Sequence, residues 1–284
     1  MKKPLKITII VVLSVVLIVG ATLTILYFVR PKGQSRSEVV LTPANNTYIE
    51  GNTKNIADCS PTESLFILAY NLKNANSYYA TISGKINASI TTQTVSGEKY
   101  KVGEDALYIS RSESFFKSTS NRFFIENDAV LVVDGELDVS ADNNKTEEYT
   151  FNAFIQQYGT DFRELSNYEL NGQNITKAEL LSSDGGVYTY RYEINVKTGV
   201  ENYRVNMYKI GGLSELPTFK KSTLEVVMTE DFMPVSVKHI DEYEAYMGVL
   251  SVSCKATLTE TFEKINDDFI VIPDCGFYKS KLGG

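Results

Sequence analysis

The chain has 284 residues, of which 43% are hydrophobic and 22% charged, and its formal net charge is −7. The first 36 residues hold six of the 28 basic residues and none of the 35 acidic ones, which leaves a net charge of −13 for the remainder. Nucleic acids are bound through basic surfaces, so we expect no nucleic-acid partner for this acidic body.

One uncharged apolar segment, Ile7–Val29, lies near the N-terminus. A helix of about 20 apolar residues is long enough to cross the hydrocarbon core of a bilayer. The segment therefore predicts a single-pass signal anchor. The lysines among residues 1–6 favour a cytoplasmic stub, so the rest would lie outside the cytoplasm at the cell membrane. A signal peptide cleaved after Ala21 is the alternative.

The stretch 30–58 is polar and contains two prolines, which predicts a linker between the anchor and a domain over residues 59–279. A helix is expected from Pro61 to Asn76, because Ser60 is a good N-cap and Glu63 follows three residues later. Its apolar face would consist of Leu65, Leu68, Ala69, Leu72 and Ala75.

The rest of the first half reads as strands. Over Ala80–Thr92, small and apolar residues occupy the even positions and polar residues the odd ones, which is typical of a strand with one dry face. Shorter strands are expected between residues 106 and 154, separated by turn residues such as those at Asp134-Gly135. A short helix is expected near Ala153–Tyr158.

The second half alternates more clearly. Tyr188, Tyr190 and Tyr192 share one face of a strand over Val187–Lys197. A turn at Lys197-Thr198-Gly199 would lead into a return strand with Tyr203, Val205 and Met207 on one face. A three-strand meander is then expected over Ser222–Glu230, Pro234–Tyr246 and Gly248–Phe262. These patterns predict a mainly β (α+β) domain, with one large curved antiparallel sheet (a half-barrel) and one or two helices on its concave face.

This order resembles the lipoprotein-localisation superfamily, the LolA/LolB/LppX-like half-barrels of bacterial envelopes. The matching features are the helix leading into the strand Ala80–Thr92, the aromatic strand Tyr188–Tyr192, the segment Glu230–Val237 and the final strand running into Phe269–Pro273. The resemblance implies a fold that binds acyl chains between sheet and helices, or that serves as an interaction module. A spanning anchor departs from the family's freely soluble or lipid-tethered carriers and argues against long-range shuttling.

The richest aromatic patch suggests where an apolar ligand would lie. Tyrosines combine a flat apolar ring with a polar tip, which suits a groove with a wet mouth. The alternative is that these side chains are core beneath the helix. The candidate groove residues are Tyr188, Tyr190, Tyr192, Tyr203, Met207, Leu250 and Val252.

Three cysteines and one histidine are the remaining candidates for chemistry. Strand parity makes Cys254 a buried thiol, while Cys59 and Cys275 lie at the two ends of the domain and would close it as a disulfide. The alternative is that all three are unpaired. His239 shares parity with apolar residues and is expected to be a packed or rim side chain. We therefore expect no metal site, no cofactor and no enzymatic activity.

The leading hypothesis is a membrane-anchored extracytoplasmic binding domain that holds a lipid or other apolar molecule in the concave face of its sheet. The alternative is a non-catalytic envelope scaffold or protein-interaction module with a filled core, whose partners would be other envelope proteins. The two hypotheses differ in whether the concave face is hollow.

Overall fold

The computed structural model describes residues 19, 22, 31–51, 54–89, 91–114, 118–136 and 138–282. The predicted anchor Ile7–Val29 lies almost wholly outside these residues. Among the helices of the described ranges, none is both long and apolar enough to span a bilayer.

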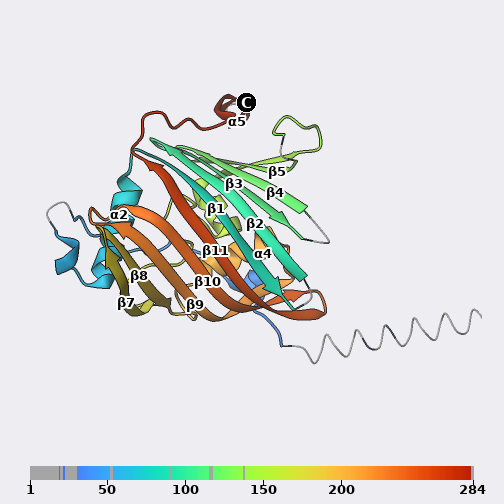
Figure 1. The fold of residues 1–284 in the computed structure, drawn as a ribbon. Coiled ribbons are helices and arrows are strands. Elements are labelled where there is room, and N and C mark those ends of the chain that lie inside the picture. Colours follow the sequence, from blue (N-terminus) through green and yellow to red (C-terminus); the bar gives the residue numbers. More distant parts are fainter. Residues whose placement is uncertain are drawn as a thin grey trace, which may run out of the picture.

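All the named strands belong to one open, curved antiparallel sheet of eleven strands, in the order β6-β5-β4-β3-β2-β1-β11-β10-β9-β8-β7 (Figure 1). The strands are β1 (Ser77–Ala88), β2 (Thr91–Val102), β3 (Asp105–Glu113), β4 (Ser118–Glu126), β5 (Ala129–Gly135), β6 (Lys145–Thr150), β7 (Ile175–Asp184), β8 (Val187–Ile194), β9 (Glu215–Thr229), β10 (Pro234–Met247) and β11 (Leu250–Ile265). Each half of the chain forms one meander, and the first and last strands pair at the centre. Consequently β6 and β7, which are consecutive in the chain, occupy opposite edges.

Helices cover both faces of the sheet. Inside the curve lie α2 (Pro61–Asn74), α3 (Phe151–Tyr158) and α4 (Glu201–Gly211), whereas α5 (Cys275–Leu282) packs on the outer face (Figure 1). The outer position of α5 is fixed by Tyr278, whose ring stacks on Phe124 with centroids 5.1 Å apart. The prediction of one large curved antiparallel sheet is confirmed. The prediction of one or two helices on the concave face is wrong, because three lie there.

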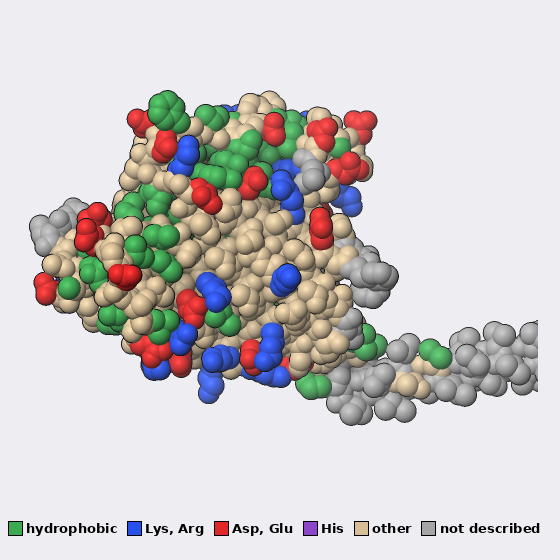
Figure 2. Space-filling view, viewed as in Figure 1, with side chains coloured by type: hydrophobic (Ala, Val, Ile, Leu, Met, Phe, Trp, Pro, Cys, Tyr) green, Lys and Arg blue, Asp and Glu red, His purple; other side chains and the backbone are tan. Residues whose placement is uncertain are grey.

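The outer face is mainly polar. Figure 2 shows its middle covered largely by uncharged polar groups and backbone, with apolar side chains gathered near the C-terminal tail and at the edge where α2, β7 and β8 lie (Figure 1). The odd positions of β1, such as Thr81 and Ser83, point this way and are partly exposed, whereas Tyr78 and Ala80 are buried on the inner face. The predicted division into one wet and one dry face is therefore observed.

Helix α2 begins where its capping residues predict. The Ser60 Oγ accepts a hydrogen bond from the Glu63 N–H at 3.2 Å, and Pro61 is the first helical residue. The helix ends at Asn74, two residues before the predicted end. Leu65, Leu68 and Leu72 on its apolar face are almost completely buried against the sheet. The expected short helix near Ala153–Tyr158 is also present as α3.

The predicted return strand is wrong. Tyr203, Val205 and Met207 lie in helix α4, which ends at Gly211 and is followed by the capping residue Gly212 with a left-handed φ of 62°. A three-residue alternation is too short to distinguish the strand period from the helix period, and here the helical register buries Tyr203 and Val205. The meander predicted after it is correct, as β9, β10 and β11.

The predicted linker is in large part packed onto the domain. Gln34 forms a β-bridge with Leu216, and Val39 and Leu41 are buried against Val205. Further along, the Thr47 N–H donates to the Leu170 carbonyl at 2.8 Å. We call residues 33–51 the strap. Its apolar residues are too few to form a recognisable pattern, so its packing was not predictable from composition.

Candidate functional site

The connection between β6 and β7 fills the inside of the sheet. Because these two strands lie at opposite edges, the chain between them must cross the concave face. It does so as α3 followed by residues 159–170, which we call the crossing segment and which contain no strand or helix. Phe162, Leu165 and Tyr168 of this segment are at most 2% exposed and pack into the core. The concave face is therefore occupied by the chain itself.

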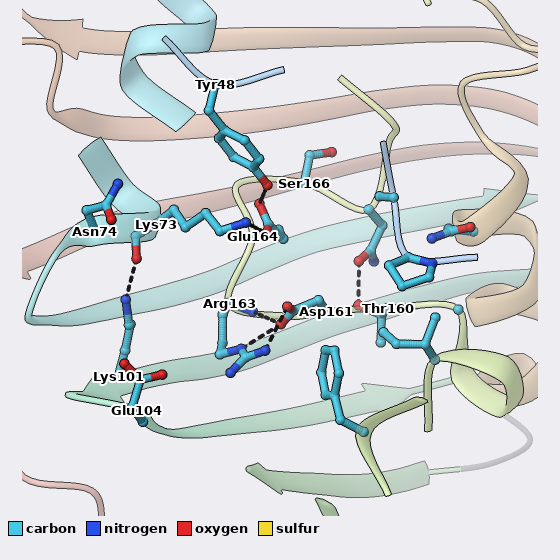
Figure 3. A pocket seen from close by; sticks show the side chains of 17 residues that line it. Tyr48, Lys73, Asn74, Lys101, Glu104, Thr160, Asp161, Arg163, Glu164 and Ser166 are labelled. Atoms are coloured by element: carbon cyan, nitrogen blue, oxygen red, sulfur yellow. Dashed lines mark hydrogen bonds and ion pairs between the residues drawn. The ribbon is translucent and has the colours of Figure 1, made fainter. Parts of the chain in front are cut away.

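A cleft of about 470 Å³ remains between the crossing segment, the C-terminal end of α2, the strap and the β2–β3 turn (Figure 3). Basic and acidic side chains line it in equal number. They are Lys73, Lys101, Arg163, Glu104, Asp161 and Glu164.

Two of the three basic groups have structural partners. Lys101 donates to the carbonyls of Lys73 at 2.6 Å and Ala75 at 2.8 Å, and so caps the end of α2, where the helix dipole is negative. Burial lowers the pKa of the Lys101 ammonium. Arg163 donates from Nε and Nη2 to the two carboxylate oxygens of Asp161 at 2.9 and 3.0 Å, a bidentate pair. Both interactions hold the cleft walls in place.

The third basic group is the most accessible. The Lys73 Nζ lies 3.4 Å from a Glu164 carboxylate oxygen and 4.1 Å from the centre of the Tyr48 ring, and its side chain is 51% exposed. The Tyr48 hydroxyl donates to the other Glu164 oxygen at 2.7 Å. Burial, with the nearby Glu164 charge, raises the pKa of Tyr48, so the phenol stays protonated. Lys73 and Glu164 thus offer one charge of each sign to the cleft (Figure 3).

An inner cavity of about 70 Å³ lies behind the cleft, and both are lined by Thr160, Ser166 and Asn167. Thr160 Oγ1 donates to Asn167 Oδ1 at 2.5 Å in the wall they share. The inner cavity is lined by the ion pair of Lys99 and Glu260, whose charged atoms are 2.7 Å apart. A polar space of this size holds very few water molecules.

His239 also lines the inner cavity, with its ring centre 5.1 Å from that of Tyr168. Burial, with the Lys99 charge nearby, lowers its pKa to about 3, so the imidazole is neutral at physiological pH. The expectation of a packed or rim histidine agrees with this position. Within the described ranges, no group of histidine, cysteine and carboxylate side chains has the arrangement of a metal site.

A buried carboxylate attaches the crossing segment to the sheet. Asp241 Oδ1 accepts hydrogen bonds from the Tyr168 hydroxyl at 2.6 Å and from Ser222 Oγ at 2.7 Å. The side chain is 1% exposed, and Oδ2 has no hydrogen-bond partner among the described residues. Burial, only partly offset by these bonds, raises the pKa of Asp241 to about 6.

The structure distributes the predicted groove residues over the core rather than along an open groove. Four of them are buried, namely Tyr190, Tyr192 and Val252 on the inner face of the sheet and Tyr203 on helix α4. The Tyr192 hydroxyl donates to the Pro61 carbonyl at the start of α2 at 2.8 Å. Tyr188 and Met207 are partly buried against the same core, and Tyr203 also borders the inner cavity. Leu250 is 47% exposed, because β11 begins beyond the reach of the covering helices.

The three cysteines are free thiols in the structure, so the predicted Cys59–Cys275 disulfide is not formed. Cys59 packs against the core on the concave face, whereas Cys275 packs with the cluster on the outer face. The two ends of the domain therefore lie on opposite sides of the sheet. Cys254 is buried, as its strand parity predicts.

Sequence patterns did not reveal the charged cleft. The crossing segment has no periodicity, and its Asp161–Glu164 charges resemble a solvated loop. A usable signal was present in β2: alternation puts Lys99 and Lys101 opposite Ala80 and Tyr78 of β1, on the inner face. Two lysines at inward positions of a central strand indicate a polar interior.

Comparison with known proteins identifies no family. No family model matches the chain, and no curated protein matches it. Among solved structures, a DUF1329 family protein from Desulfovibrio piger is similar at 12% identity over 79% of this chain and all of that chain, with a TM-score of 0.26. An N-terminal dehydratase from the difficidin assembly line is similar at 9% identity over 77% of this chain and 85% of that one, with a TM-score of 0.12. At such scores neither likeness carries an argument about this chain.

Proposed function

We propose that this chain is a membrane-anchored extracytoplasmic binding domain without catalytic activity, which takes a small polar or zwitterionic molecule in the cleft. The observation that carries the proposal is the exposed Lys73 beside Glu164, one charge of each sign at 3.4 Å in a cleft of about 470 Å³. A ligand with an anionic and a cationic group would pair with both side chains and replace their weak mutual contact.

A lipid chain is less well supported than the sequence suggests. An acyl chain would lie on the apolar concave surface, but Phe162 and Leu165 of the crossing segment already cover it. Displacing the segment would also break the bond from Tyr168 to Asp241, at 2.6 Å in a buried site. Leaving a buried carboxylate without its donor costs on the order of 1–3 kcal/mol or more. A filled interior favours a ligand that binds in the cleft alone.

Calorimetry on the detergent-solubilised full chain tests the proposal. The probes are phosphoethanolamine and free amino acids as zwitterions, and a fluorescent fatty acid as the apolar comparison. We expect a zwitterion to bind and the Lys73→Gln and Glu164→Gln variants to lose that binding. The matched control is Lys54→Gln, which removes an exposed lysine paired with Glu63 outside the cleft. Binding of the fatty acid alone, or equal binding by Lys73→Gln and Lys54→Gln, contradicts the proposal.

A second candidate function is a protein-interaction module. The tail after β11 alternates between buried Ile270 and Ile272 and two apolar residues, Phe269 and Val271, that are 87% and 74% exposed. Apolar side chains exposed together on this tail suit a partner protein from the envelope. Crosslinking in intact cells would then show adducts that a Phe269→Ser/Val271→Ser variant loses. Unchanged adducts in that variant would rule out this surface.

A further inference from the structure

Two large apolar side chains are exposed where β10 turns into β11. Met247 is 53% exposed and Leu250 is 47% exposed, and the turn between them contains Gly248 with a left-handed φ of 59°. Elsewhere on β11, the inward apolar side chains Val252 and Ala256 are buried beneath the helices. The tip of this hairpin therefore exposes apolar surface, whereas the rest of β11 buries its apolar side chains in the core.

The strap begins against this same hairpin. The Gly33 N–H donates to a Glu215 carboxylate oxygen at 2.5 Å, and the Gly33 backbone lies so close to the Tyr246 ring that a Cβ there would be 2.5 Å from it. Ser214 fixes the hairpin in turn: its N–H donates to the Tyr246 carbonyl at 2.8 Å, and its Oγ accepts from the Gly248 N–H at 3.0 Å. In Figure 1 the start of the described chain, in blue, and the β10–β11 turn lie at the same end of the sheet.

Chain length limits how far this end can be from a membrane. The predicted anchor ends at Val29, four residues before Gly33. An extended chain spans at most about 3.5 Å per residue, so these residues reach about 14 Å. The head-group layer on each side of the hydrocarbon core is roughly 5–8 Å thick. Arg30 and Lys32 lie in this short connection and can pair with the phosphate groups of lipid heads.

We propose that Met247 and Leu250 enter the head-group region of the membrane that anchors the chain, so that the domain rests on lipid through its β10–β11 turn. The inference rests on the membrane anchoring in the proposed function. Partial burial of exposed apolar side chains is favourable by about 25 cal/mol per Å². Because the anchor is covalently attached, this small gain is enough to orient the domain.

The orientation would direct the cleft toward the aqueous phase. Thr91 lies at the end of β2 nearer this turn, since it pairs with Ala88, which pairs with Cys254 near the start of β11. Lys101, in the cleft wall, is ten residues further along β2. At about 3.3 Å per residue this places it roughly 33 Å further along the strand, away from the turn that contacts lipid. A ligand of the cleft would then arrive from solution rather than from the lipid beneath the domain.

Tryptophan fluorescence tests the contact directly, because the chain contains no tryptophan. The full chain with Leu250→Trp is reconstituted into vesicles of palmitoyl-oleoyl phosphatidylcholine and phosphatidylglycerol, with and without brominated acyl chains. The matched control is Phe269→Trp, an 87% exposed position in the tail beyond the other end of β11. We expect emission from Leu250→Trp at shorter wavelength and several-fold stronger quenching by brominated lipid than for Phe269→Trp. Equal, weak quenching of both variants overturns the inference.

Flotation of the wild-type chain with vesicles after an alkaline wash separates the two proposals. A chain that floats while Leu250→Trp escapes quenching retains its anchor and refutes only the lipid contact of the hairpin. A chain that fails to float refutes the anchoring, and the hairpin inference with it. If Leu250→Trp does not fold, as judged by its melting transition in detergent, Met247→Trp replaces it at the other exposed position of the turn.

Discussion

The concave face of this sheet has two interiors built on different principles. Beneath α2 lies an apolar core that includes Leu65, Leu68, Tyr192 and Leu224, none of which lines the cleft or the inner cavity. Beneath the crossing segment lies a charged interior that contains Lys99, Glu260, His239 and Asp241, next to two cavities. The first interior is stabilised by burial of apolar side chains, and the second by hydrogen bonds and ion pairs between polar groups. The comparison teaches that the cavities of this domain lie where an irregular segment meets the ends of the helices, because its side chains do not pack in the regular rows of a helix face.

The largest expected effect is in the charged interior. A Lys99→Met variant leaves Glu260 buried and unpaired, which costs about 3–5 kcal/mol of unfolding free energy. Replacing both partners, as Lys99→Met with Glu260→Met, should cost far less because no charge remains buried. Burial already raises the pKa of Glu260, with Lys99 opposing the rise. Denaturant unfolding of the singles and the double measures the difference, and a double variant as unstable as the singles would contradict the role of pairing.

In the apolar core, the loss of side-chain volume should lower the free energy of unfolding by an amount that does not depend on pH. Leu68→Ala removes a completely buried side chain of α2 and is expected to cost about 2–5 kcal/mol. The loss should be the same at pH 5 and pH 7.5, because no titrating group changes its environment. Leu180→Ala, at a position 49% exposed, is the control and should change stability by less than about 0.5 kcal/mol. A pH-dependent loss for Leu68→Ala would mean that the two interiors are coupled.

Asp241 should make the charged interior sensitive to pH. Its pKa is about 6 when folded, against an ordinary value of 3.8. Between these values the folded chain holds a proton that the unfolded chain has lost, so stability falls as pH rises from about 4 to 6. The shift is worth roughly 3 kcal/mol at most, since one pKa unit is about 1.36 kcal/mol.

An Asp241→Asn variant should remove that part of the pH dependence. The amide oxygen can still accept from Tyr168 and Ser222, but no charge is buried above pH 6. We expect the variant to be about 2 kcal/mol more stable than the wild type at pH 7.5, with the gap closing near pH 4. Thermal melts across that range measure it. If stability changed with pH equally in the two proteins, the Asp241 carboxylate would not be the cause of the fall in stability between about pH 4 and 6.

The smallest expected effect concerns the covering helix itself. Ser60→Ala removes the N-cap of α2 and should cost about 1 kcal/mol, whereas Ser60→Asp should retain most of the stability. Because the cap lies outside both interiors, neither change should alter ligand binding in the cleft. Melting temperatures and the calorimetric assay described above test the two halves of this prediction.

Much of the architecture was predictable. The start of α2, the long strand β1 and the meander β9–β11 follow from local patterns, because capping and alternation act within a few residues. The error at Tyr203 and Met207 arose where three alternating residues fit both periods. The crossing segment could not be predicted, because a stretch without periodicity does not indicate which surface it packs against.

What the sequence determined by itself is which side of each strand is buried, since side chains alternate along a strand whatever its neighbours are. Only the tertiary structure decided that the concave face is filled. The pairing of β1 with β11 places the edges so that the chain must cross from β6 to β7. It also brings Lys99 to Glu260, 161 positions away. Alternation places each of them on the inner face of its own strand, but only the order of the strands makes them partners.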